Sequence, residues 1–167
     1  MYIQTQRLEL KPIEDKDLDD LILLLTDDVV KQTYMLPDFP DRAAAMTLAK
    51  RIQALTNDQT RYVWGIYTGG QLIGMLNDTE VSGKAIEMGY ATLPKYHNQG
   101  YTTEAMKAVI EYLFGCGFEK VIAGAFQHNI PSIRVMIKSG MQKQENVDII
   151  DYRGHSYTCV YYAICKE

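Results

Sequence analysis

The segment from Pro94 to Ala105 carries residue types that suit anion binding at the start of a helix. It follows a strand-like apolar stretch and leads into a long amphipathic pattern. Backbone N–H groups in a first helical turn have no intrahelical partner and lie at the positive end of the dipole, which suits a phosphate or pyrophosphate. Gly100 lets the backbone approach an anion closely, and Thr102 and Thr103 add hydroxyl donors. The alternative is an ordinary capped helix start that binds nothing.

The histidines and cysteines do not indicate a metal centre. The sequence holds three of each: His97, His128 and His155, and Cys116, Cys159 and Cys165. The histidines lack metal-ligand spacing, and the cysteines lack CxxC spacing. An odd number of cysteines fits a reducing cytoplasm, and small buried apolar side chains explain them better than a catalytic thiol. We therefore expect no metal and a cytoplasmic location.

Composition narrows the class of protein. The chain has 167 residues, 47% hydrophobic and 23% charged, which predicts one globular domain over residues 1–167. Its net charge of -4 comes without a basic cluster, so we expect no nucleic-acid partner and a mild preference for amines. No apolar run reaches the ~20 residues of a membrane span, and the alternating N-terminus differs from a signal peptide.

The elements that must position these residues follow from hydrophobic periodicity. Strands are predicted around Leu8–Leu10 and over 61–68, 71–78, 84–93, 120–126, 147–152 and 156–164. Helices are predicted after Asp15 or Asp17, after Asp41, over 102–115, and between Asn129 and Gly140. The order is β-α-α-β-β-β-α-β-α-β-β, which indicates an α+β or α/β domain with a mixed, mostly antiparallel sheet and about four flanking helices.

Three motifs together resemble the GNAT superfamily of N-acyltransferases. Glu87-Met-Gly-Tyr90, Gln99-Gly-Tyr101 and Thr103-Glu-Ala105 are similar to its acyl-CoA-binding motif. Asn129, Ser132 and Lys138-Ser-Gly-Met141 are similar to its next motif. The opening segment from Thr5 to Pro12 resembles the ribosomal-protein-alanine acetyltransferase branch. The element order also matches the GNAT fold, so the resemblance covers essentially the whole chain.

The resemblance implies an acetyl-CoA site without a metal. The turn from Asn98 to Thr103 is expected to hold the CoA pyrophosphate. A splayed strand and the following helix start are expected to hold the pantetheine arm. The implied CoA-binding residues are Tyr90, Ala91, Thr92, Asn98, Gln99, Gly100, Tyr101, Thr102, Thr103, Asn129 and Ser132.

Catalytic roles also follow from the resemblance. Glu87 is the first candidate for the base that deprotonates the amine, and Asp151 is the second; either could instead be a solvated strand carboxylate. Ser132 is the candidate acid for the leaving thiolate, or else a first-turn hydroxyl bonded to backbone. Met136 stands where many members carry a tyrosine acid, and His97 stands at the usual basic position.

The predicted function is acetyl transfer from acetyl-CoA to a primary amine by direct attack in a ternary complex. The amine is a protein N-terminus, a polyamine or a small metabolite. Two alternatives stay open: a CoA-binding sensor or subunit without catalysis, and an interaction protein without a ligand. Met35, Leu36, Pro37 and Phe39 fall where the resembled family often builds a lid over the acceptor site. A hydrophobic plug over the core explains them better than a specific acceptor contact. The sequence does not give the oligomeric state; an exposed final hairpin often dimerises in the resembled branch, which makes a homodimer one candidate.

Overall fold

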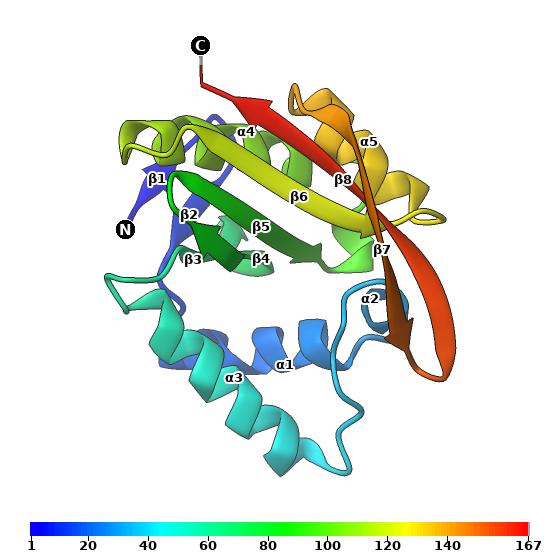
Figure 1. Ribbon diagram of the computed structural model, residues 1–167. Coiled ribbons are helices and arrows are strands. Elements are labelled where there is room, and N and C mark those ends of the chain that lie inside the picture. The colour runs from blue at the N-terminus through cyan, green and yellow to red at the C-terminus, as the bar shows by residue number, and fades with distance from the viewer. Residues whose placement is uncertain (167) are drawn as a thin grey trace. The chain divides into compact units, whose positions relative to one another are not determined.

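The computed structural model describes residues 1–166 and contains eight strands, five α-helices and two short 3-10 helices within them (Figure 1). The strands are β1 (Ile3–Gln4), β2 (Glu9–Lys11), β3 (Val63–Thr68), β4 (Gln71–Ser82), β5 (Ala85–Thr92), β6 (Lys120–Phe126), β7 (Gln142–Tyr152) and β8 (His155–Cys165). The α-helices are α1 (Leu18–Thr26), α2 (Asp28–Lys31), α3 (Arg42–Thr56), α4 (Tyr101–Gly115) and α5 (Ile130–Lys138). The 3-10 helices are η1 (Asp15–Asp17) and η2 (Pro94–Tyr96).

The strand order is β1-β2-β3-β4-β5-β6-β8-β7, and every pairing described below is antiparallel except that of β5 with β6. The predicted mixed, mostly antiparallel α/β fold is therefore confirmed. The residues form two compact units, one from 1–77 and 90–105, the other from 78–89 and 106 onward. The single domain over 1–167 stays a prediction.

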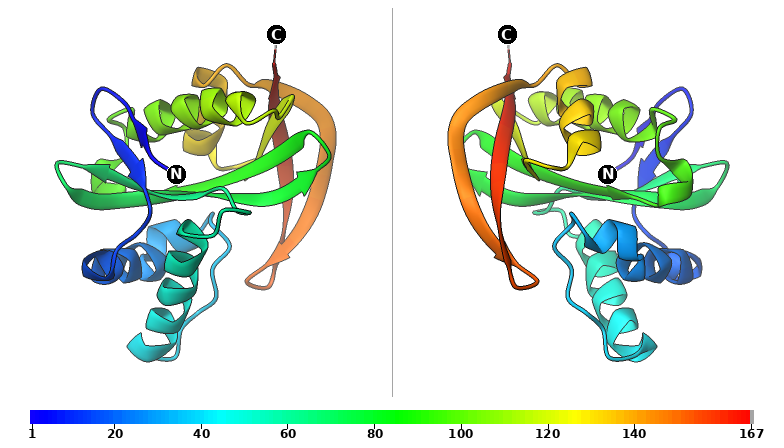
Figure 2. Two further views of the ribbon diagram at one scale, coloured as in Figure 1. Left: turned by 90° about the vertical axis from the view of Figure 1, so that its left-hand side faces the viewer. Right: turned by 90° about the vertical axis from the view of Figure 1, so that its right-hand side faces the viewer.

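In the first unit, helices cover one face of a meander. β1, β2, β3 and the first part of β4 pair in sequence. Gly69 and Gly70, both at positive φ, form the predicted turn between β3 and β4. Figure 2 shows α1 and α3 together on one face of β3 and β4. Leu21 of α1 and Ala45 of α3 are fully buried in the core between these elements.

Of the residues predicted to cap α1 and α3, Asp41 caps its helix by its side chain and Asp17 does not. Asp41 accepts a hydrogen bond from the Ala44 N–H, as predicted for the start of α3. Asp17 precedes α1 without capping it by its side chain. Its carboxylate instead accepts from the Glu14 N–H and from the Tyr67 hydroxyl, at 3.0 and 2.7 Å.

The second unit is built around β6. β6 pairs with β5 in parallel and with β8 in antiparallel fashion, and β7 pairs with β8. Figure 2 shows α4 and α5 on the same face of β5. Asn129 caps α5 by accepting from the Ser132 N–H, as predicted. Arg153 and Gly154, at φ 51° and 76°, form the predicted hairpin turn.

The elements that the sequence did not predict are short or polar. β1 has two residues and α2 four, too few for a periodic pattern to stand out. β7 begins at Gln142, five residues earlier than predicted, because Gln142–Asn146 is polar and its register shifts between Lys143 and Val147. The extension of β4 to Ser82 is likewise exposed.

Candidate functional site

The turn before α4 has the conformation that anion binding requires. Asn98 and Gly100 adopt φ 60° and 80°, and residues 98–100 are exposed. The Glu104 N–H donates to the Gly100 carbonyl at 3.0 Å, which is the first backbone hydrogen bond of the helix. The N–H groups of Tyr101, Thr102 and Thr103 come before this bond, so they belong to the unpaired first turn of a helix. The turn therefore presents donors at the positive end of α4.

Hydrogen bonds join the end of β5 to this turn. Thr92 is buried, and its hydroxyl shares a hydrogen bond of 2.9 Å with that of Thr102. The Thr92 carbonyl accepts from His97 Nε2 at 2.7 Å. His97, at the position where the resembled pattern has a basic residue, thus directs this nitrogen at the protein backbone. The Thr102 hydroxyl is likewise engaged within the protein, by its hydrogen bond with Thr92.

Arg7 is the cation that contacts the turn. Its Nε donates to Glu104 Oε2 at 2.7 Å, and Nη1 donates to the Gln99 carbonyl at 3.0 Å. Its guanidinium also lies 4.5 Å above the Tyr101 ring. In the sequence analysis, Arg7 has no role of its own and appears only within the segment from Thr5 to Pro12. Its role at the turn depends on a contact 92 residues along the chain, which no local pattern reveals.

Ala91 and Thr92 belong to a tightly packed part of the first unit. Both are buried, whereas Tyr90 before them is half-buried. A Cβ atom on Gly74 of β4 would lie only 2.4 Å from the Ala91 carbonyl oxygen. The backbones of β4 and β5 therefore approach closely here, and only glycine allows it.

Glu87 lies in the second unit, on the part of β5 that pairs with β6. The parallel pairs run from Ala85 with Lys120 to Glu87 with Ile122, while both strands continue beyond them. Among the described residues of this unit, Glu87 is the last of β5 in that ladder. Burial raises the pKa of its carboxyl; a hydrogen bond from Thr79 opposes the rise, and the charges of Glu80 and Asp148 add to it.

Asp148 and Tyr161 share the face of the second unit that carries Glu87. Glu87 pairs with Ile122, and Tyr161 pairs with Gly124, two residues further along β6. Asp148 pairs with Cys159, two residues before Tyr161 on β8. The period of two along each strand therefore points these side chains to one face. The Tyr161 hydroxyl donates to Asp148 Oδ2 at 2.8 Å. Burial, followed by this bond, raises the pKa of Tyr161 far above its usual range.

The sequence analysis missed this pair because it proposed Asp151 instead. Asp151 is three residues beyond Asp148 and so alternates to the other face of β7. It is exposed at the hairpin end, pairs with Ser156, and accepts a hydrogen bond from the Ser156 hydroxyl. The structure thus groups Glu87 with Asp148 and leaves Asp151 outside that group. Strand alternation from a known register would have found Asp148; the sequence did not supply the register.

Asn129 and Ser132 are brought together at the start of α5. The Ser132 N–H donates to Asn129 Oδ1 at 3.3 Å, and both residues are half-buried. Met136, one turn further along, is completely buried. A thioether carries no proton to donate, so this position does not replace the family's tyrosine as an acid.

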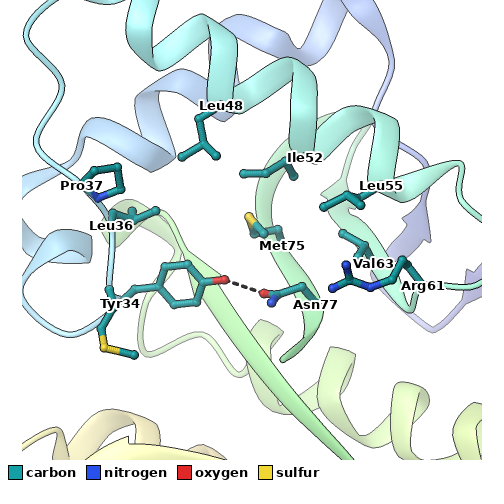
Figure 3. Close-up of a pocket in the computed structure, with 11 residues that line it drawn as sticks. Tyr34, Leu36, Pro37, Leu48, Ile52, Leu55, Arg61, Val63, Met75 and Asn77 are labelled. Atoms are coloured by element: carbon teal, nitrogen blue, oxygen red, sulfur yellow. Dashed lines mark hydrogen bonds between the residues drawn. The ribbon is translucent and has the colours of Figure 1, made fainter. Parts of the chain in front are cut away.

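A cavity of about 260 Å³ lies in the first unit beneath the segment that follows α2 (Figure 3). Its walls are mainly apolar and come from that segment, α3, β3 and β4: Tyr34, Met35, Leu36, Pro37, Leu48, Ile52, Leu55, Arg61, Val63, Met75 and Asn77. The Tyr34 hydroxyl donates to Asn77 Oδ1 across one wall. Burial raises the pKa of Tyr34 to about 12, so the phenol stays protonated at neutral pH.

Comparison with known proteins decides the family. The model of the acetyltransferase (GNAT) domain matches residues 7–142. The chain belongs to the GNAT family. It is 27% identical to the uncharacterised N-acetyltransferase YoaA of Bacillus subtilis over 170 residues, covering 98% of this chain and 96% of that protein.

Solved GNAT structures have the same fold. The crystal structure of a GNAT-family acetyltransferase from Bacillus anthracis matches with a TM-score of 0.85 at 25% identity, covering 99% of this chain and 98% of that one. RimL, a ribosomal L7/L12 alpha-N-protein acetyltransferase solved with coenzyme A, matches with a TM-score of 0.84 at 15% identity, covering 99% and 98%. The predicted resemblance is thereby confirmed.

GNAT membership makes this chain an acetyl-CoA-dependent acyltransferase. The backbone N–H groups at the turn before α4 suit the phosphate groups of acetyl-CoA. Within residues 1–166, no three His, Cys, Asp or Glu side chains are grouped so as to hold a metal ion. No helix in the described part of the chain is long and apolar enough to cross a membrane.

Proposed function

We propose that this chain transfers the acetyl group of acetyl-CoA to a primary amine by direct attack. The observation that carries the proposal is the half-buried Glu87, whose carboxyl has a raised pKa at the end of the β5–β6 ladder. An alkylammonium has a pKa of about 10.4, so the amine must lose a proton before it attacks. A carboxylate with a raised pKa is a better base for that step than an exposed one.

The donor is held by two sets of residues in this proposal. The N–H groups from Asn98 to Thr103 bind the pyrophosphate, with Gly100 allowing its close approach. Tyr90, Ala91, Thr92, Asn129 and Ser132 contact the pantetheine arm. Two features support this assignment: the left-handed conformations at residues 98 and 100, and the match of the GNAT model across these segments.

Ser132 is the group that hydrogen-bonds the departing sulfur. Its support is chemical: Met136 is buried and carries no proton, whereas Ser132 is a half-buried hydroxyl at the start of a helix. The thiol of the leaving group has a pKa of about 8.5, so a hydrogen bond to the thiolate suffices and full proton transfer is not required. The positive end of the α5 dipole adds to the stabilisation.

The cavity beside Tyr34 is our candidate for the carbon skeleton of the acceptor. Its apolar walls suit methylene or aromatic groups, while Asn77 and the neutral Tyr34 phenol offer polar contacts. Leu36, Ile52 and Met75 line it and belong to the same buried cluster as Ala91 of β5. The apolar lining of the cavity favours a small amine, or an N-terminal residue with an apolar side chain, over a polyamine.

The test is acetyl-CoA with a panel of amines, scored by free thiol. The panel contains spermidine, phenethylamine, leucinamide and short peptides with apolar or acidic N-termini. Thiol release with the apolar amines above the amine-free rate supports the proposal. CoA binding by calorimetry without release for any amine supports the alternative, a non-catalytic CoA-binding protein, which the absence of a tyrosine at Met136 leaves open.

A further inference from the structure

We infer that Arg7 is a positioning residue for donor binding: it holds the Gln99–Gly100 peptide so that the Gly100 N–H points toward the pyrophosphate. The inference rests on the proposed binding of that pyrophosphate by the turn from 98 to 103. It extends that proposal to a residue outside the turn.

The geometry of one peptide group carries the argument. In a trans peptide, the carbonyl of one residue and the N–H of the next point in opposite directions. Arg7 Nη1 donates to the Gln99 carbonyl at 3.0 Å, and the described peptides are all trans. The Gly100 N–H therefore points away from the guanidinium. Fixing the carbonyl on the Arg7 side fixes this donor on the opposite side.

Arg7 is itself held by Glu104, which Thr5 also binds, and by the Tyr101 ring. Its Nε donates to Glu104 Oε2 at 2.7 Å, and its backbone N–H donates to Glu104 Oε1 at 2.9 Å. The Thr5 hydroxyl donates to the same Oε1 at 2.6 Å. The guanidinium also covers the Tyr101 ring. A side chain fixed in this way spends little entropy when it orients another group.

The ion pair also makes the helix start more favourable for an anion. Desolvation would raise the pKa of Glu104, but the hydrogen bonds from Thr5 and Arg7 outweigh it, and the pKa is lowered. Glu104 is therefore ionised at neutral pH, in the first turn of α4. An unpaired carboxylate there would compete with a phosphate for the same helix dipole. Arg7 cancels that charge while it orients the peptide.

Arginine is required for this role because both bonds come from one planar group. Lysine keeps the charge, but as a point donor on a flexible stem it does not reproduce the guanidinium fork between Glu104 and Gln99. His97 does not replace it, because its Nε2 is bonded to the Thr92 carbonyl.

The experiment compares Arg7→Gln and Arg7→Lys with a matched control, Arg42→Gln. Arg42 forms an exposed ion pair of 2.6 Å with Asp19 in the same unit, so its loss reports the general effect of removing such a pair. Calorimetry measures the affinity for CoA and for 3′-dephospho-CoA, which shares the pyrophosphate. We expect both Arg7 variants to weaken both ligands about tenfold or more, with Arg42→Gln unchanged.

A spectroscopic readout separates positioning from a general loss of fold. In the parent, CoA or inorganic pyrophosphate should shift the Gly100 amide resonance, and both Arg7 variants should reduce that shift while the other amide resonances keep their dispersion. Full affinity in Arg7→Lys would overturn the inference, because charge alone would then suffice. A loss confined to CoA would also overturn it, because Arg7 would then contact the 3′-phosphate. Absence of CoA binding in the parent would instead contradict the proposed function.

Discussion

The half-buried carboxyl of Glu87 makes the stability of the folded protein depend on pH. Burial raises its pKa, with Glu80 and Asp148 adding to the shift. A raised folded-state pKa means that the folded chain binds this proton more tightly than the unfolded chain. Stability from Glu87 is therefore fully present below the unfolded pKa and is lost as pH rises through the folded value. Above the folded pKa, the protein with Glu87 ionised is therefore less stable than the protein with Glu87 protonated.

Replacing Glu87 with glutamine should separate these two effects. Glu87→Gln keeps the shape and removes proton acceptance, so we expect turnover to fall roughly 10²–10⁴-fold with CoA affinity nearly unchanged. The melting temperature should rise relative to the parent above the folded pKa, because the buried charge is gone. Thiol release gives turnover, calorimetry gives affinity, and thermal unfolding at several pH values tests the sign.

Asp148→Asn is the control for that interpretation. It removes one neighbouring negative charge while its side-chain oxygen can still accept from Tyr161. The acid limb of the pH–rate profile should move to lower pH, because the pKa of Glu87 falls. An unchanged acid limb in this variant, together with full activity in Glu87→Gln, would assign proton removal to another group or to water.

Ser132→Ala tests assistance to the leaving thiolate. A hydrogen bond formed mainly in the transition state affects turnover more than binding, so turnover should fall about ten- to a hundredfold. The KM for acetyl-CoA should stay within about threefold. Steady-state kinetics with the best amine measures both. A raised KM at normal turnover would make Ser132 a donor contact only, and unchanged values would mean that the thiolate leaves unassisted.

At the scale of elements, the start of α4 depends on a glycine in the left-handed conformation. A Cβ at Gly100 would meet only Arg7, at 3.4 Å, so space is not the limit on the protein side. The limit is φ 80°, which costs an L-residue about 1–2 kcal/mol. A substitution here therefore strains the backbone, and in the proposed site it would also obstruct the anion. The sequence suggested only the second effect.

Gly70→Ala is a matched control for Gly100→Ala. Both glycines have φ 80°, both are exposed, and both lie in the first unit. We expect similar losses of stability from the two variants by thermal unfolding. Only Gly100→Ala should weaken CoA binding by calorimetry. Equal CoA affinity in the two variants would contradict the placement of the pyrophosphate at residues 98–103.

Elements with a strong local signal could be predicted from the sequence, and those that depend on distant partners could not. β6 was predicted over Lys120–Phe126 because a short apolar run flanked by glycine there suits a buried strand. The cap of α5 followed from Asn129 and Pro131. The Asp148–Tyr161 pair depends on the register of β7 with β8, and the Arg7 contact depends on tertiary packing. The roles assigned to Glu87 and Ser132 came from motif similarity and stay predictions.

At the scale of the whole molecule, the β7–β8 hairpin is the candidate for self-association. β7 ends the strand order, and two of its apolar side chains, Val147 and Ile149, are 52% and 68% exposed. They lie two residues apart and so share one face. An edge strand with exposed apolar groups is a template for pairing with a second copy. These features support self-association of the protein through this hairpin.

Ile149→Lys tests that expectation. A charge on the exposed face of β7 should shift the protein to the monomer, because burying a lysine in an interface between copies is unfavourable. Sedimentation velocity over a range of protein concentrations measures the change. Val81→Lys, at another exposed apolar residue, should leave the association state as it is. A parent that sediments as a monomer throughout would contradict self-association through this hairpin.

The contact between Gly74 and the end of β5 has a consequence for the evolution of this protein. A side chain at Gly74 would lie 2.4 Å from the Ala91 oxygen and 3.0 Å from Thr92 Cα, and both neighbours are backbone atoms. Neither can rotate away as a side chain would. In a saturation library we expect no substitution at codon 74 to survive selection for acetyl transfer. A laboratory lineage that diverges toward a new acceptor should therefore keep this glycine while the cavity walls change around it.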